Sequence, residues 1–262
     1  MSYRWRKTDT MLALHTERRI VWQLNFDPRE GKPYFHPLTS RDGVELTELR
    51  PSDHPWHRGI WCSWKFINGL NYWEEDEQGV SEGRTSLLAT SVEPRSDFSA
   101  TIQHSLEYHP PGCPPLLTER RYLAVSAPDG TGRFTVDWHS EFTAGDTTVQ
   151  LTRTPIPGEP HGMIWGGYAG LSLRLSPAAA QTAPHDSEGR QGAPAIHGHP
   201  ACWVEYAGIR VEDDPGNMGY PAYWYAWSEG MHYFSPAVLF REPCTMPAGS
   251  QLRLKYRLTV TP

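Results

Sequence analysis

Residues 134–142 read Phe-Thr-Val-Asp-Trp-His-Ser-Glu-Phe, and apolar and ionisable side chains alternate along most of this stretch. Successive side chains of a β-strand point to opposite faces, so the apolar residues around Trp138 share one face. The other face carries three ionisable groups, those of Asp137, His139 and Glu141. The segment therefore predicts a strand of an antiparallel sheet, with one face in the core and the other in solvent.

The same alternation returns at residues 252–260, where basic side chains separate apolar ones. Asp42-Gly43 and Pro128-Asp129-Gly130 are turn signals between such runs. No stretch of a dozen residues keeps the apolar spacing of a helix without a Pro or Gly. Further strands are predicted at 20–26, 44–49, 85–92, 99–108, 116–125, 149–154, 171–175 and 201–206.

These runs predict an all-β fold, a large antiparallel β-sandwich with few or no long helices. At 262 residues the chain fits one domain over 1–262. Residues 176–200 are rich in Ala, Pro, Gly and small polar groups, which favours a mobile loop within that domain. A domain boundary at 176–200 is the alternative.

The composition narrows the choice of partners. A net charge of −6 without a basic block disfavours nucleic acid and anionic membranes. No stretch reaches the roughly 18 apolar residues of a membrane helix, and the start of the chain lacks a signal-peptide core, so a soluble cytoplasmic protein is expected. The four dispersed cysteines fit free thiols in a reducing compartment. The 11 Trp and 12 Tyr also allow a homo-oligomer.

Residues 53–61 read Asp-His-Pro-Trp-His-Arg-Gly-Ile-Trp and concentrate groups that need partners when buried. Carbohydrate recognition uses flat aromatic faces for the sugar ring and planar polar groups for its hydroxyls. The stretch therefore favours a site for a small carbohydrate. The candidate substrate-binding residues are His36, Asp53, Arg58, Trp61, Trp64, His161 and Tyr168.

Proton transfer is the chemistry most natural to histidine and carboxylate in such a site. His54 or His57 is the candidate catalytic acid or base, and Glu141 or His139 is its candidate partner from a neighbouring strand. The competing interpretation is a turn packed by tryptophans, in which both histidines are satisfied structurally.

A divalent metal is a second alternative, because His54-x-x-His57 supplies two ligands. The residues that would complete the set are Asp53, His36, His139, His161 or Glu141. Against it, such a pair arises by chance in a chain with 12 histidines, and Pro55 favours a turn over a helix. Phosphate-binding, dinucleotide-binding and serine-nucleophile motifs are missing, so no cofactor is predicted.

A family resemblance is carried by eight segments that occur in order along most of the chain. They are 32–38, 53–61, 68–69, 72–74, 166–174, 214–217, 234–240 and 248–249. In these segments the chain resembles the PmoA-like family of soluble bacterial proteins, whose members resemble proteins of sugar utilisation. That resemblance implies a galactose-mutarotase-like supersandwich. The family's name comes from a membrane subunit of methane monooxygenase, and the methane function is set aside because the chain lacks a membrane span.

Together these observations predict a carbohydrate-active enzyme, an epimerase, lyase or hydrolase acting on a sugar or oxidised sugar glycoside by acid–base catalysis. A non-catalytic carbohydrate-binding protein and a metal-dependent sugar enzyme remain the alternatives. The prediction requires that the histidines after Asp53 and the ionisable face of residues 136–142 open into one tryptophan-lined hollow.

Overall fold

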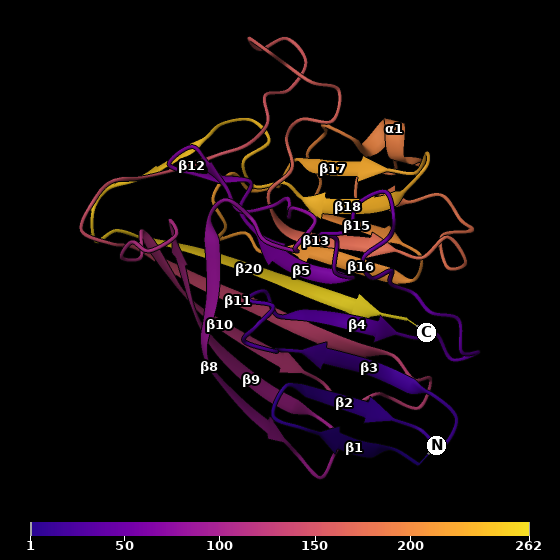
Figure 1. Cartoon of the computed structure of the whole chain (residues 1–262). Coiled ribbons are helices and arrows are strands. Elements are labelled where there is room, and N and C mark those ends of the chain that lie inside the picture. The colour runs from indigo at the N-terminus through magenta and orange to yellow at the C-terminus, as the bar shows by residue number, and fades with distance from the viewer. Residues whose placement is uncertain (1, 262) are drawn as a thin grey trace.

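The computed structural model describes residues 2–261, and its regular secondary structure consists almost entirely of antiparallel strands (Figure 1). An eight-stranded sheet, called the first sheet, contains in spatial order β1 (Arg4–Lys7), β2 (Met11–His15), β3 (Ile20–Asn25), β4 (Tyr34–Leu38), β5 (Ile60–Ser63), β13 (Gly170–Leu175), β18 (His232–Pro236) and β17 (Trp224–Trp227). The predicted all-β class is confirmed.

The second sheet also has eight strands, and all of its pairings are antiparallel. Its spatial order is β14 (His185–Asp186), β15 (Trp203–Tyr206), β16 (Ile209–Asp213), β20 (Gln251–Val260), β11 (Phe134–Ala144), β10 (Leu117–Val125), β9 (Ala100–His109) and β8 (Arg84–Pro94). A smaller sheet at one end contains β19 (Cys244–Met246), β12 (Val149–Thr152), β6 (Phe66–Ile67) and β7 (Leu70–Asn71).

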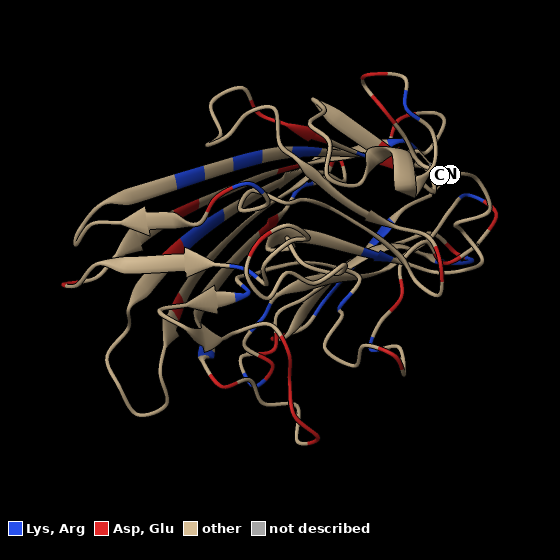
Figure 2. Cartoon of the chain, turned by 90° about the horizontal axis from the view of Figure 1, so that it is seen from above, with Lys and Arg blue, Asp and Glu red and all other residues tan. Residues whose placement is uncertain are grey.

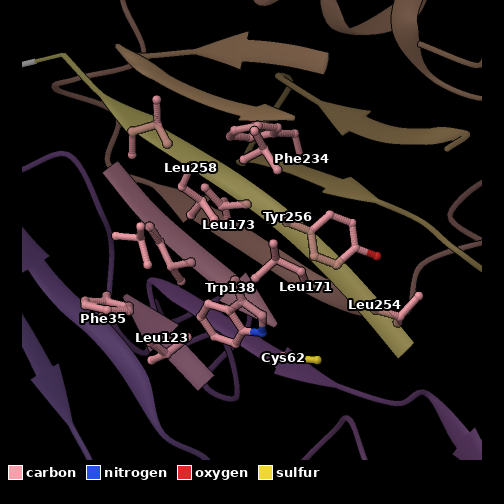
Figure 3. Packing of buried hydrophobic residues seen from close by; sticks show 14 of the residues in the cluster. Phe35, Cys62, Leu123, Trp138, Leu171, Leu173, Phe234, Leu254, Tyr256 and Leu258 are labelled. Atoms are coloured by element: carbon pink, nitrogen blue, oxygen red, sulfur yellow. The ribbon is translucent and has the colours of Figure 1, made fainter. Parts of the chain in front are cut away.

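The main core lies between the two large sheets (Figure 3). Trp138 on β11 and Tyr256 on β20 are partners in register, and both are buried against Leu171 and Leu173 of the first sheet. Alternation along β11 and β20 sends their polar residues to the opposite, solvent face, as the sequence predicts. The antiparallel β-sandwich is therefore confirmed.

One predicted strand differs from the structure. Residues 44–49 form isolated bridges, of Glu45 with Thr39, Thr47 with Leu175 and Leu49 with Arg58, because the segment changes partner and does not pair along one strand. Residues 176–200 contain β14 and the short helix α1 (Ala193–Ile196). Ala193 and Ile196 are buried in the core, so this segment packs on the sheet beside β17 (Figure 1).

Lys, Arg, Asp and Glu are interspersed over strands and loops, without a large area of one sign (Figure 2). In residues 2–261 no helix is long and apolar enough to cross a membrane. The four cysteines, Cys62, Cys113, Cys202 and Cys244, are free.

Candidate functional site

The candidate site lies on the outer face of the first sheet, the face turned away from the main core. Along β5, Ile60 and Cys62 point into the core while Trp61 points outward. Tyr233 on β18 and Tyr225 on β17 also point outward, because their neighbours in sequence are core residues. A second aromatic cluster therefore lies on this face, and loops cover it.

A pocket of about 230 Å³ opens between this cluster and the loops above it. We call it the aromatic pocket, and most of its walls are Trp and Tyr rings. It is smaller than the roughly 300–1,000 Å³ clefts of drug-sized ligands, which favours a ligand of one ring. Its lining residues are His54, Trp56, His57, Trp73, Glu74, Trp165, Tyr168, Tyr225, Met231 and Tyr233.

The turn that brings the histidines to the pocket depends on Gly59. Its φ is +64°, and a Cβ at this position would lie 2.4 Å from the carbonyl oxygen of Phe35 on β4. Only glycine allows the chain to pass the sheet this closely in this conformation. Gly59 thereby determines how closely His57 and Arg58, the two residues before it, approach the first sheet.

His54 is held by a chain of two contacts at the mouth of the pocket. Its Nδ1 lies 2.7 Å from Oδ2 of Asp53, and Nη2 of the buried Arg174 donates to both Asp53 oxygens, at 2.9 and 3.0 Å. Burial alone would raise the pKa of Asp53, but the hydrogen bonds from His54 and Arg174 and the Arg174 charge lower it. The ionised carboxylate only accepts hydrogen bonds, so Nδ1 of His54 carries the proton and Nε2 stays available.

His57 lies directly beneath His54. The two rings stack with centroids 4.5 Å apart and 17° between their planes, and His57 also contacts Trp61 and Tyr233. Burial, followed by the nearby His54 and Arg174, lowers the pKa of His57 to about 2, so its ring is neutral. Its Nδ1 is buried without a partner among the described residues, and the ring serves as a flat aromatic floor.

Glu74 supplies the carboxylate of the aromatic pocket. Tyr168 donates its hydroxyl to Oε1 at 2.9 Å, Asn71 donates to Oε2 at 2.6 Å, and Lys65 forms an ion pair with Oε2. Burial would raise the pKa of Glu74, but the Lys65 charge and the three hydrogen bonds lower it. Glu74 is therefore an ionised hydrogen-bond acceptor, and Tyr168, whose pKa is raised by burial and by Glu74, stays protonated.

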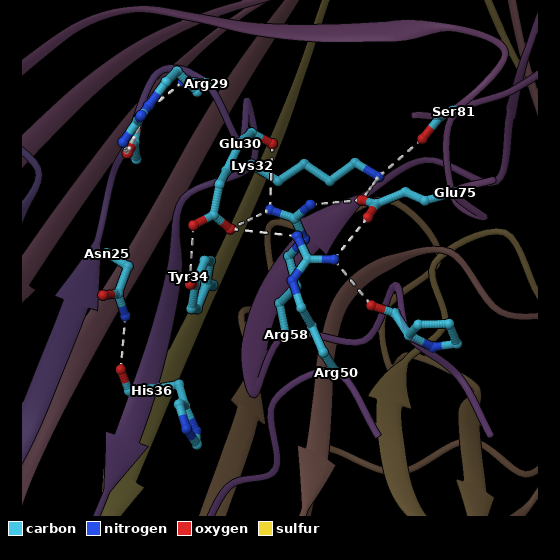
Figure 4. Close-up of polar contacts among 12 residues, drawn as sticks. Asn25, Arg29, Glu30, Lys32, Tyr34, His36, Arg50, Arg58, Glu75 and Ser81 are labelled. Carbon is cyan, nitrogen blue, oxygen red and sulfur yellow. Dashed lines mark hydrogen bonds and ion pairs between the residues drawn. The ribbon is translucent and has the colours of Figure 1, made fainter. Parts of the chain in front are cut away.

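An ion network lies behind the turn and holds the roofing loops in place (Figure 4). Arg58 pairs with Glu75 at 2.6 Å and with Glu30 at 3.0 Å, and Lys32 pairs with Glu75 at 3.2 Å. Burial lowers the pKa of Lys32 to about 8 despite the Glu75 charge. Arg50 ties Glu75 to the turn through the Pro55 carbonyl at 3.1 Å. The network connects the 50–58 loop with the loop after Trp73.

Several sequence-predicted binding residues are therefore not available to a ligand. Arg58 is 1% exposed and engaged in the network through Nη1 and Nη2, and Trp61 is 1% exposed beneath His57. Trp64 lies in the main core against Phe142, because the chain turns inward after β5 ends at Ser63. For these three residues the structure contradicts direct substrate contact.

His36 and His161 lie outside the lining of the aromatic pocket. His36 is engaged with Thr47 Oγ1 at 3.0 Å, and burial lowers its pKa to about 4. His161 is exposed on the loop before β13. Of the predicted binding residues, Tyr168 lines the pocket and Asp53 acts on it through His54.

His139 and Glu141 do not join His54 and His57. They lie on the outer face of the second sheet, with the whole sandwich core between them and the aromatic pocket. Glu141 pairs there with Arg253 at 2.8 Å, and His139 lines a separate groove of about 380 Å³ beside Lys255. The predicted common hollow is therefore wrong. The alternation of β11 identifies its outer face correctly but does not say which sheet face the 53–61 turn covers.

Seven of the ten lining residues are not among the candidate residues that the sequence predicts. Tyr225 and Tyr233 alternate with the core residues Ala226 and Phe234, so strand alternation identifies them as outward-facing once β17 and β18 are known. The others come from loops that only the tertiary fold brings together. The seven residues are Trp56, Trp73, Glu74, Trp165, Met231 and the pair Tyr225 and Tyr233 on adjacent strands.

The geometry bears on the metal alternative as well. The lone pairs of imidazole nitrogens lie in the ring plane, so two stacked rings do not point them at one ion. Within residues 2–261 no three His, Cys, Asp or Glu side chains are grouped as metal ligands.

The comparisons with known proteins concern the whole chain. A model of a family of unknown function, DUF6807, matches residues 12–262. The chain belongs to the DUF6807 family. The PmoA-like resemblance drawn from sequence segments is corrected by this match, and nothing in the comparisons supports it.

No curated protein matches this DUF6807 chain. Among solved structures, it is similar to the galactosidase domain of an alpha-galactosidase-sucrose kinase, AgaSK, at 9% identity and a TM-score of 0.42. The match covers 99% of this chain and 41% of the other. A likeness this distant carries no argument about function, which is argued below from the pocket alone.

Proposed function

We propose that the aromatic pocket binds one ring of a small carbohydrate and that His54 and Glu74 transfer protons at it. The observation that carries the proposal is the Arg174–Asp53–His54 chain at the mouth of a pocket walled by Trp and Tyr rings. The aromatic walls suit the C–H faces of a sugar ring, and the ionised Glu74 suits its hydroxyls.

The two polar groups approach the pocket from different segments and have different proton states. Glu74 is ionised and accepts a hydrogen bond or a proton from a substrate hydroxyl. His54, oriented through Nδ1 by Asp53, presents Nε2 and exchanges a proton there. This pairing replaces the predicted partners Glu141 and His139, and it supports an epimerase, lyase or hydrolase without distinguishing among them.

One observation favours a second candidate, a carbohydrate-binding protein without catalysis. Both oxygens of Glu74 already accept hydrogen bonds, from Tyr168 on one side and from Asn71 and Lys65 on the other. A carboxylate so fully engaged is a better fixed acceptor than a mobile proton carrier. In that case the pocket binds sugar and releases it unchanged.

Proton NMR of a panel of reducing sugars and methyl glycosides, incubated with the protein, tests the proposal. We expect one sugar class to be converted, and His54→Ala to slow the conversion by about 10²–10⁴-fold because a positioned acid or base is lost. His139→Ala is the matched control on the other sheet and should leave the rate unchanged. Binding without conversion would reduce the proposal to the second candidate, and an unaffected rate in His54→Ala would remove His54 from it.

A further inference from the structure

A second cavity, of about 250 Å³, lies beside the aromatic pocket on the same face of the first sheet. We call it the Trp227 cavity. Ile164 from the loop before β13 forms part of its wall, α1 forms another part, and the end of β17 forms the rest. Its lining residues are Ile164, Ala193, Pro194, His197, Ala226, Trp227, Ser228 and Glu229.

The walls of the Trp227 cavity are mostly apolar, and two of its polar rings are engaged. The indole nitrogen of Trp227 donates to the Glu229 carbonyl at 2.7 Å, and Nδ1 of His197 lies 3.2 Å from the Ala226 carbonyl. Burial lowers the pKa of His197, so its ring forms a neutral wall. Ser228 and the exposed Glu229 are the remaining polar lining residues, so a sugar ring would find few partners here, whereas an apolar group suits the other walls.

The two cavities share their walls. The His197 ring, in the Trp227 cavity, packs 4.8 Å from the ring of Tyr225, which lines the aromatic pocket. Tyr225 and Trp227 stack with 6.3 Å between centroids, and Ile164 and Trp165 are neighbours in sequence that each line one cavity. About one aromatic layer therefore separates the two spaces.

We propose that the Trp227 cavity holds the apolar aglycone of a glycoside whose sugar ring occupies the aromatic pocket. The inference rests on the proposed function and adds the substrate class, a glycoside with an apolar ring as its aglycone. The position of the cavity across one shared aromatic wall from the aromatic pocket, and its largely apolar lining, carry it. Ile164 and Trp165, 65% and 48% exposed, line the Trp227 cavity and the aromatic pocket respectively.

Isothermal titration with matched methyl and phenyl glycosides tests the inference, using both anomers of glucose, galactose, mannose and xylose. For the sugar that binds, we expect the phenyl glycoside to bind at least about tenfold more tightly than its methyl counterpart, because the phenyl ring is removed from water. Equal affinities would overturn the inference and leave the proposed function intact. Binding by none of these glycosides would overturn both.

Three variants locate the phenyl preference. Trp227→Ala removes a wall, and Ser228→Phe fills the Trp227 cavity, so both should bring the ratio of phenyl to methyl affinity toward one. Ile164→Ala, at an exposed position, should lower the ratio without a folding defect. Leu88→Ala on the second sheet, at a residue 58% exposed, is the matched control and should keep the wild-type ratio. A ratio unchanged in all three cavity variants would place the phenyl ring elsewhere and overturn the inference.

Discussion

The outer faces of the two large sheets carry similar residues, but one face forms a covered pocket and the other is open. On the first sheet, His54, His57 and Glu74 lie under loops, in a pocket with aromatic walls. On the second sheet, Asp137 and Glu141 of β11 form exposed ion pairs with Arg257 and Arg253 of β20. Histidine and carboxylate on a strand face therefore do not define a site by themselves. On the first sheet, the loops and the buried ion network that fix such side chains around a pocket make the difference.

The ion pairs show the same contrast. Arg58 and Glu75 have side chains 2% and 4% exposed, while Arg257 and Asp137 have side chains 57% and 48% exposed. Pairs in solvent are worth little, but a buried charge that loses its partner is costly. The buried network thus supports the loops that cover the aromatic pocket, whereas the exposed ion pairs lie on an uncovered sheet face.

Arg58→Met should have the largest effect. It leaves Glu75 and Lys32 with an unbalanced buried network, so we expect the free energy of unfolding to fall by about 3–5 kcal/mol. Arg257→Met breaks an exposed pair and should cost at most about 1 kcal/mol. Chemical denaturation of both variants measures the difference, and equal losses would mean that the network beneath the 53–61 turn does not support the fold.

The two faces should also respond differently to acid. His57 has a pKa lowered by burial to about 2, against 6.5 when unfolded. Below pH 6.5 His57 therefore binds a proton in the unfolded chain but stays neutral in the folded protein. Its contribution to the free energy of unfolding decreases as the pH falls. His57→Gln removes this contribution, so its free energy of unfolding should depend less steeply on pH, by up to about 1.4 kcal/mol per pH unit.

His139→Gln is the control for this titration. Burial and then Lys255 lower the pKa of His139 as well, but its ring is only half-buried on the open face. Its substitution should change the slope between pH 6.5 and 5 by less than His57→Gln does. Denaturation curves across that range decide the point, and identical slopes in both variants would contradict the sealed, neutral state of His57.

The sequence was sufficient to predict those features of the strands that depend on local alternation of apolar and polar residues. The pattern of β11 and β20 has period two, and it identified both their core and their solvent faces. Trp61 and Trp64 could not be separated in the same way, because β5 is buried on both sides and its sequence does not alternate between apolar and polar residues. Their contrasting positions follow from where β5 ends.

The aromatic pocket itself depends on pairing between distant segments. Trp61 on β5 and Tyr233 on β18 contact each other across the intervening strand β13, which comes from a distant part of the sequence. Trp73, Trp165 and Met231 reach the pocket from three separate loops. No spacing along the chain encodes such an arrangement, so the sequence identified the 53–61 turn but paired it with the wrong sheet face.

The most direct test of the account is the binding of simple sugars to the two faces. Trp165 lines the aromatic pocket at 48% exposure, and Tyr122 lies on the open face of the second sheet at 37% exposure. Ligand-observed NMR titration of methyl glycosides should show binding to the wild-type protein, a loss of about tenfold or more in Trp165→Ala, and no change in Tyr122→Ala. An absence of binding, or an equal loss in both variants, would contradict a carbohydrate site under the roof of the first sheet.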